Sequence, residues 1–182
     1  MDALKASLRA APVVDRNGYE YFVHGVTDGI PIVEPAVMRD VARAIAAHVD
    51  PTEFDKIVAP EAMGIHHATA VSLELDRPFV VVRKRGYGFE GERALHQETS
   101  YGEGELYLNA IDPGDRVLLV DDVRSSGGTL RAVVDGLLEV GAELVDVVVV
   151  VGRTDTDPVE LPVPVTTLLE VHVEDGRVVI DD

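Results

Sequence analysis

One segment near the middle of the chain restricts the fold more than any other. Residues 117–120 form a short apolar run, two aspartates follow directly, a loop of small residues comes next, and a helical pattern begins at Gly128. An unbroken apolar run is typical of a parallel strand that is covered on both faces. Ligands bind beyond the carboxyl ends of such strands. The segment therefore predicts a strand, a ligand-binding turn and a helix within an α/β fold.

The same alternation of strand and helix extends over about residues 35–151. We expect helices at 2–10, 35–48, 64–75 and 128–140, and strands at 19–23, 56–59, 78–82, 105–109, 116–120, 145–151, 165–173 and 177–180. Asp175-Gly176 between the last two strands is typical of a hairpin turn. The pattern predicts one α/β domain over residues 1–182, in which helices flank a central, mostly parallel sheet.

One long connection interrupts this pattern. Residues 84–104 are polar and dotted with glycines, and we expect them to form an irregular loop. A loop of this length inside a compact domain is unusual unless it is functional or mobile.

The composition narrows the classes of function. The chain of 182 residues carries 33 acidic and 16 basic residues, a formal net charge of −17. This excess of acid argues against binding to nucleic acid or to an anionic membrane surface. The absence of cysteine removes disulfides, thiolate nucleophiles and cysteine-based zinc sites. No segment has the pattern of a membrane span or a signal peptide, so we expect a cytoplasmic protein.

Arginine predominates among the basic residues. Lys5, Lys56 and Lys84 are lysines, and the other thirteen basic residues are arginines. Such an acidic, lysine-poor chain favours a halophilic protein, because salt screens the self-repulsion and carboxylates stay hydrated. An ordinary acidic cytosolic protein is the alternative.

The turn after residue 120 has the chemistry of a sugar-phosphate site. Its backbone N–H groups, its hydroxyls and the following helix N-terminus suit a phosphate, and its glycines permit close approach. Two carboxylates would repel phosphate alone, but they accept hydrogen bonds from the hydroxyls of a ribose 5′-phosphate. The residues assigned to the phosphate are Arg124, Ser125, Ser126, Gly127, Gly128 and Thr129, and those assigned to the ribose are Asp121 and Asp122.

Two further motifs complete the predicted site. Arg83-Lys84-Arg85 is the only run of three basic residues in this acidic chain, which suggests a local anion. Residues 60–64 form a second turn from strand to helix, at the carboxyl end of another strand.

The segment 117–129 resembles the phosphoribosyl pyrophosphate (PRPP) motif of type I phosphoribosyltransferases. Segments 21–31, 60–64, 82–88 and 104–109 look like the short archaeal purine enzymes, usually described as hypoxanthine/guanine phosphoribosyltransferases. The resemblance implies a purine salvage enzyme that converts a purine base and PRPP to a nucleoside 5′-monophosphate and pyrophosphate. It also implies a requirement for Mg²⁺, a homodimer, and a small hood contributed by about residues 1–34 and 152–182.

The resemblance also assigns roles to individual residues. Asp121 and Asp122 would serve catalysis and hold Mg²⁺, mainly through PRPP and water. Lys84 and Tyr101 would also be catalytic, Tyr101 from a mobile loop that excludes water when it closes. The assignments for pyrophosphate are Glu61, Ala62, Met63, Gly64, Arg83 and Lys84, and those for the base are Phe22 and Val123.

The sequence departs from the family at the residues that move the proton of the base. Ser125 stands where the animal hypoxanthine/guanine enzymes carry Asp, and Ser100 stands where the adenine enzymes carry Glu. Glu98, Glu103 or a water would then serve. Adenine phosphoribosyltransferase activity is therefore one alternative, and a non-catalytic PRPP-sensing regulator is another.

Overall fold

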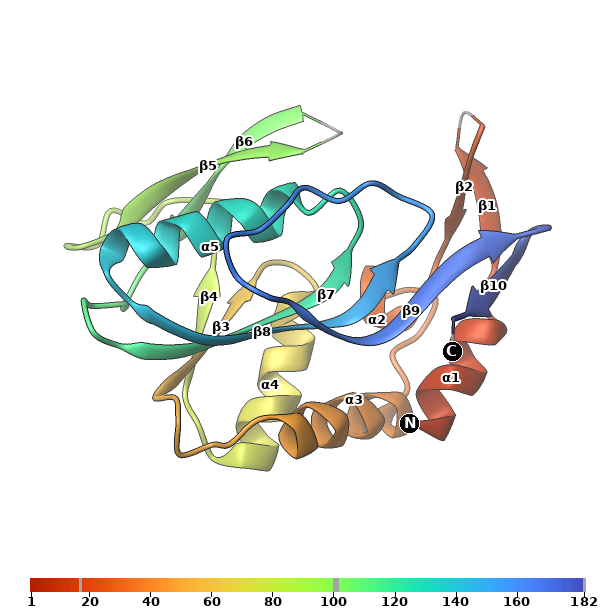
Figure 1. Ribbon diagram of the computed structural model, residues 1–182, viewed down its shortest axis with the longest axis horizontal. Helices are drawn as coiled ribbons and strands as arrows, with labels where there is room; N and C mark the ends of the chain where they lie inside the picture. Colours follow the sequence, from red (N-terminus) through yellow and green to blue (C-terminus); the bar gives the residue numbers. More distant parts are fainter. Residues whose placement is uncertain (17, 100–101, 182) are drawn as a thin grey trace.

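The computed structural model describes residues 1–16, 18–99 and 102–181 (Figure 1). A six-stranded sheet forms its centre, in the order β10-β9-β8-β7-β3-β4. All neighbouring strands are parallel except β9 and β10, which form the antiparallel hairpin expected around Asp175-Gly176. The bounds of these strands are β3 Lys56–Pro60, β4 Phe79–Val82, β7 Arg116–Arg124, β8 Glu143–Arg153, β9 Thr166–Glu174 and β10 Arg177–Ile180.

Helices cover both faces of this sheet. The N-terminal helices and α4 pack against one face, and α5 packs against the other (Figure 1). The helices are α1 Asp2–Arg9, α2 Gly25–Asp28, α3 Pro35–His48, α4 Gly64–Leu75 and α5 Gly128–Val140. The expected α/β fold with a central, mostly parallel sheet is therefore confirmed.

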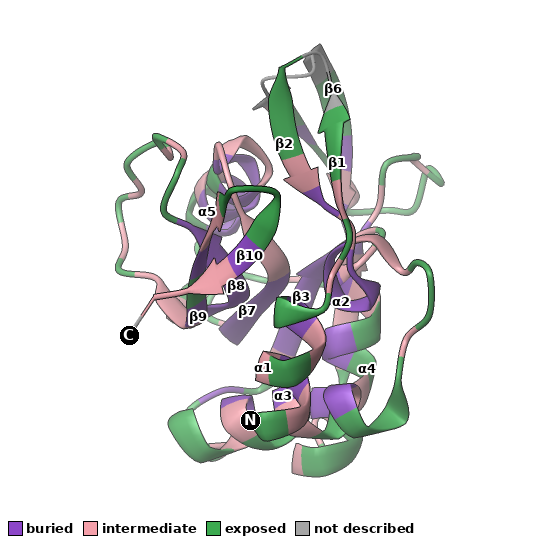
Figure 2. Ribbon diagram, turned by 90° about the vertical axis from the view of Figure 1, so that its right-hand side faces the viewer, coloured by how far each residue is buried: buried purple, intermediate pink, exposed green. Residues whose placement is uncertain are grey.

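The central strand β7 shows why the apolar runs are continuous. Leu118 and Val120 contact the core on the side of α3 and α4, whereas Val117 and Leu119 contact the core on the side of α5. All four side chains have no exposed surface, and Figure 2 shows the buried residues concentrated in the central strands and the inner helix faces. Because both faces of the strand are covered, alternation with polar residues is absent.

Two antiparallel hairpins stand above the sheet, on opposite sides of its carboxyl-terminal edge (Figure 1). One consists of β1 Val13–Arg16 and β2 Tyr19–Phe22, and the other of β5 Arg93–Thr99 and β6 Gly102–Leu108. Strands β9 and β10, from the segment expected to help form the hood, extend the central sheet.

The hairpin of β5 and β6 corrects an expectation. Residues 84–104 were expected to be an irregular loop, but most of their second half is paired strand. Leu95, Leu106 and Leu108 are buried against α5, while their neighbours His96 and Glu105 are exposed. This alternation is a strand signal, which the surrounding glycines and charges obscured.

The strand β7 also runs further than expected. It continues to Arg124, so Asp121 and Asp122 lie among the last residues of the strand and not after its end. None of the helices in the described ranges combines the length and apolar character that crossing a bilayer requires.

The central strand generates a first prediction. Leu118→Ala removes a fully buried side chain from the middle of the sheet, so we expect it to lower the free energy of unfolding by about 2–5 kcal/mol. Leu73→Ala is the matched control, because Leu73 is 82% exposed on α4 and should cost about 0.5 kcal/mol or less. Urea unfolding measures both changes. Equal changes in the two variants would contradict this assignment of the core.

Candidate active site

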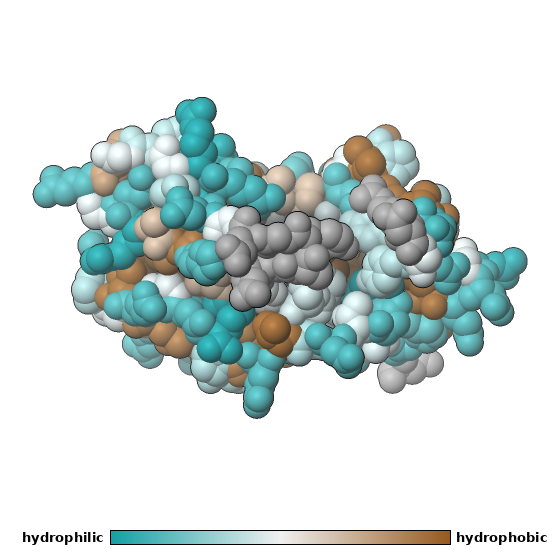
Figure 3. All heavy atoms as spheres, turned by 90° about the horizontal axis from the view of Figure 1, so that it is seen from above, coloured by the Kyte–Doolittle hydropathy of each residue, from teal (hydrophilic) through white to brown (hydrophobic). Residues whose placement is uncertain are grey.

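A cavity of about 380 Å³ opens at the carboxyl ends of β3 and β7 and at the N-terminus of α5. Figure 3 shows the molecule from above, where hydrophilic side chains predominate and apolar side chains form only scattered patches. Because its lining residues come from the carboxyl ends of these strands, the cavity lies at the edge of the sheet where the sequence predicted it. It is lined by Thr27, Asp28, Pro60, Glu61, Ala62, Met63, Lys84, Asp121, Asp122, Val123, Ser125, Ser126, Gly127, Gly128, Thr129 and Leu130.

The acid pair on β7 forms one wall of this cavity. Asp121 is only 6% exposed, and one of its carboxylate oxygens accepts a hydrogen bond from the N–H of Asp122 at 2.9 Å. Burial raises the pKa of Asp121 to about 6, although the positive charge of Lys84 opposes this shift. Burial and the neighbouring Asp121 also raise the pKa of Asp122 well above its ordinary value. Two buried carboxylates favour a ligand that brings hydroxyl donors or a cation.

The loop from Arg124 to Thr129 forms a second wall. Gly127 has a φ of +78°, a conformation that favours glycine, and a Cβ there would lie 3.2 Å from Val159. The first N–H groups of a helix have no acceptor within the helix, so those of Gly128 and Thr129 are available to a ligand. With the helix dipole, these donors favour an anion.

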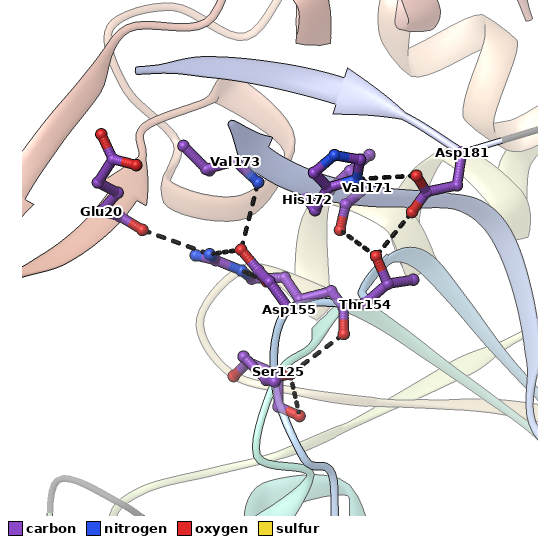
Figure 4. A network of polar contacts seen from close by, with 10 residues as sticks. Glu20, Ser125, Thr154, Asp155, Val171, His172, Val173 and Asp181 are labelled. Atoms are coloured by element: carbon purple, nitrogen blue, oxygen red, sulfur yellow. Dashed lines mark hydrogen bonds and ion pairs between the residues drawn. The ribbon is translucent and has the colours of Figure 1, made fainter. Parts of the chain in front are cut away.

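A neighbouring segment holds the opposite side of this loop. The carbonyl of Ser126 accepts a hydrogen bond from the N–H of Val159 at 2.9 Å. The hydroxyl of Thr156 lies 3.3 Å from the carbonyl of Ser125 and 3.1 Å from that of Arg153, and its single hydrogen serves one of them at a time. The segment after β8 therefore binds the Ser126 carbonyl and lies within hydrogen-bond distance of the Ser125 carbonyl. Figure 4 shows Ser125 close to a network of polar contacts that includes Thr154, Asp155 and Asp181.

The turn after β3 forms the third wall. The peptide bond between Glu61 and Ala62 is cis. Nε of Arg83 lies 2.8 Å from a carboxylate oxygen of Glu61, an ion pair without the alignment of a hydrogen bond. Arg83 is not among the lining residues, whereas Lys84 is. Lys84 is therefore the member of the basic cluster placed to meet an anion in the cavity.

A second cavity of about 330 Å³ adjoins the first, and Thr27, Val123 and Ser125 line both. Its remaining lining consists of Tyr19, Tyr21, Phe22 and Arg153. The guanidinium of Arg153 lies over the rings of Tyr19 and Phe22, 4.8 and 5.6 Å from their centres, and it pairs with Asp155. This cavity has aromatic walls suited to a flat, apolar ring.

Helix α2 is fixed by polar contacts. Asp28 accepts hydrogen bonds from the hydroxyls of Tyr21 and Thr27, at 2.5 and 2.7 Å, and from the N–H of His24 at 3.0 Å. The ring of His67 bonds to the carbonyl of Val26 at 2.9 Å, and burial lowers the pKa of His67 to about 4. His67 is thus a neutral residue that joins α4 to α2.

The structure brings most of the predicted residues to these two cavities and places a few elsewhere. Gly64 packs beneath Asp121, because a Cβ on it would lie 3.4 Å from a carboxylate oxygen of Asp121. Arg124 is turned away from the lining, with Nη2 3.5 Å from the carbonyl of Val159. Tyr101 and Ser100 lie outside the described residues, as do the side chains of Glu98 and Glu103. Sequence reasoning missed Tyr19, Tyr21, Thr27, Asp28 and Arg153.

Comparison with known proteins identifies the family. The family model described as "Phosphoribosyl transferase domain" matches residues 32–174, which include the acid pair, the loop and both strand ends. The chain belongs to this family. It is therefore a phosphoribosyltransferase, as the resemblance predicted, and the acid pair and the loop after it lie in the matched region.

Curated relatives of this phosphoribosyltransferase span nearly the whole chain. HGPRTase-like protein 3 of Haloterrigena turkmenica is 61% identical over 173 residues, which cover 95% of this chain and 93% of the relative. HGPRTase-like protein 2 of Natrialba magadii is 51% identical over 183 residues, with 99% of each chain covered. A solved adenine phosphoribosyltransferase of Rhodothermus marinus is 28% identical, has a TM-score of 0.76, and matches 93% of this chain and 98% of its own.

The raised pKa of Asp121 generates a prediction for this phosphoribosyltransferase. As the pH rises from about 4 to about 6, the unfolded chain releases the Asp121 proton first, so the folded state loses stability. Above pH 6, this difference in pKa between the folded and the unfolded chain lowers the free energy of unfolding by about 3 kcal/mol. Asp121→Asn stays neutral and keeps an acceptor for the Asp122 N–H. We therefore expect its free energy of unfolding to exceed that of the wild type by up to about 3 kcal/mol at pH 7.5, and to be similar at pH 4.

Urea unfolding at constant salt measures this difference. The control is Asp112→Asn, because Asp112 is an exposed turn residue and its replacement should shift stability little at either pH. Equal stability of Asp121→Asn and the wild type at pH 7.5 would contradict the assignment of a charged, poorly solvated carboxylate.

Proposed function

We propose that this protein is a purine salvage enzyme that transfers the phosphoribosyl group of PRPP to hypoxanthine or guanine, releasing pyrophosphate. The observation that carries the proposal is the acid pair at the end of β7 followed directly by the amide-lined loop at the start of α5. Carboxylates beside an anion site suit a ligand with both hydroxyls and phosphate. The names of the haloarchaeal relatives support the choice of base.

Each wall of the cavity has a task in the proposed reaction. The N–H groups and hydroxyls of residues 125–129 hold the 5′-phosphate, and Asp121 and Asp122 accept hydrogen bonds from the ribose hydroxyls. The negative charge of the pair also favours the positive charge that develops at the anomeric carbon. Lys84 and the backbone of residues 61–63 receive the leaving pyrophosphate. Most of the rate enhancement then comes from positioning and electrostatics.

The second cavity takes the base in this proposal. Phe22 offers a ring for stacking, and Val123 continues the apolar wall toward the ribose site. Because Thr27, Val123 and Ser125 line both cavities, a base in the second lies beside the ribose in the first. The described residues include no carboxylate in the lining of the second cavity, so the proton of the base passes to another group or to water.

The acid pair also suits Mg²⁺. Carboxylate oxygens are the ligands that this hard cation prefers, and it usually keeps waters and substrate phosphates as its other ligands. Among the described residues no group of three His, Cys, Asp or Glu side chains could hold a metal ion. We therefore propose that Asp121 and Asp122 hold Mg²⁺ mainly through PRPP and water. The ion would neutralise charge on the leaving pyrophosphate.

The proposal is tested with a panel of bases. We expect the protein, with PRPP and Mg²⁺ in molar salt, to form nucleotides from hypoxanthine and guanine more efficiently than from adenine, xanthine or orotate. Chromatography of the products and release of pyrophosphate measure turnover. The double variant Asp121→Asn with Asp122→Asn is the control, and it should lose at least about a hundredfold in kcat/KM while staying folded.

The outcomes separate the alternatives. Preference for adenine would replace the proposed base but keep the reaction, as the structural likeness to an adenine enzyme allows. PRPP binding without turnover on any base would indicate a regulator. The homodimer implied by the family resemblance is a separate proposal, which light scattering of the wild-type protein tests.

A further inference from the structure

The hairpin of β5 and β6 is seated on α5 beside the loop of residues 124–129. Leu95 on β5 is buried, and a Cβ on Gly136 of α5 would lie 2.4 Å from one of its methyl carbons. The missing side chain at Gly136 therefore leaves the space that Leu95 occupies. This contact seats β5 against the second half of α5, which spans Gly128–Val140.

A polar contact links the same face of the hairpin to the cavity. Gln97 follows Leu95 by two residues, so both side chains point to the same face of β5. The amide Nε2 of Gln97 donates a hydrogen bond to the hydroxyl of Thr129 at 2.6 Å. Thr129 lies in the first turn of α5 and lines the cavity beside Gly127 and Gly128. The hairpin thus touches the loop proposed to bind the 5′-phosphate.

The direction of this hydrogen bond decides what the Thr129 hydroxyl can do. A hydroxyl has one hydrogen and two lone pairs. Because Thr129 accepts the N–H of Gln97, its own hydrogen remains available for donation to an acceptor in the cavity. The bond also restricts rotation of the threonine side chain, so a phosphate oxygen would meet a donor that is already oriented.

We propose that Gln97 is a positioning residue for the 5′-phosphate of PRPP, acting through the hydroxyl of Thr129. The inference rests on the proposed function, because it takes residues 125–129 as the phosphate site. It adds that the hairpin supports the phosphate site from outside the cavity. PRPP binding and seating of the hairpin on α5 then strengthen each other, since each favours the same orientation of Thr129.

Two substitutions at Gln97 test the proposal. Gln97→Leu removes the amide, and we expect the KM for PRPP and the Kd for ribose 5-phosphate to rise roughly tenfold. The KM for the base should stay within about twofold. Gln97→Glu places an acceptor against Thr129, which captures the hydroxyl hydrogen and adds a negative charge near the phosphate. We expect this variant to raise both constants roughly a hundredfold.

The controls separate positioning from a structural role. His96→Leu changes an exposed neighbour on the opposite face of the same strand, and it should leave both constants unchanged. In a Thr129→Val background, Gln97→Leu should have no further effect on PRPP, because the hydroxyl through which it acts is gone. A further tenfold loss in that background, or equal losses for PRPP and base, would overturn the proposal.

A variant outside the cavity tests whether the seating of the hairpin on α5 affects PRPP binding. Gly136→Ala favours the helix but takes the space of the buried Leu95, so we expect a higher KM for PRPP, while the gain in helix propensity offsets part of the cost of overpacking. Unchanged PRPP constants in Gly136→Ala and both Gln97 variants, with an active wild type, would overturn this inference alone. A wild type that neither binds PRPP nor forms product would overturn the proposed function as well.

Discussion

The loop of residues 124–129 at the start of α5 is the feature on which the rest of the site depends. In the proposed function, a chain with a net charge of −17 binds a polyanionic substrate against its own field. Few cationic side chains are placed for this task, because Arg83 is paired with Glu61 and Arg124 is turned toward Val159. The loop instead offers backbone N–H groups and a helix N-terminus. On the other side of the loop, the carbonyl of Ser126 accepts a hydrogen bond from the N–H of Val159, and that of Ser125 lies 3.3 Å from the hydroxyl of Thr156.

The buried acid pair places negative charge directly beside a loop whose donors favour anions. Burial at the end of β7 makes the charge of Asp121 and Asp122 unfavourable in the ligand-free protein. In our proposal the ribose hydroxyls donate hydrogen bonds to these carboxylates and a cation offsets their charge. Substrate binding therefore stabilises the charged pair. Many of the other acids are exposed on a surface where hydrophilic side chains predominate (Figure 3). Their role is then solvation of that surface, separate from the chemistry of the pair.

Much of this arrangement could be predicted from the sequence, because its signals are local. One short segment holds the apolar run of β7, the small-residue loop and the start of α5. Each of these patterns is recognised from residues a few positions apart. The hairpin of β5 and β6 was missed because its inward leucines, such as Leu95, alternate with polar residues in a glycine-rich stretch. Arg153 was missed for another reason. Its place depends on contacts between distant segments, as with the carbonyl of Glu20, which no local pattern encodes.

We propose that backbone donors at the start of α5, and not the basic cluster, hold the 5′-phosphate. A crystal structure of the protein with PRPP and Mg²⁺ is the decisive measurement. We expect the 5′-phosphate oxygens to lie within hydrogen-bond distance of the N–H groups of residues 126–129 and of the Thr129 hydroxyl, with the ribose hydroxyls at Asp121 and Asp122. A 5′-phosphate bound at Arg83–Arg85, with the loop of residues 124–129 free of ligand, would contradict it.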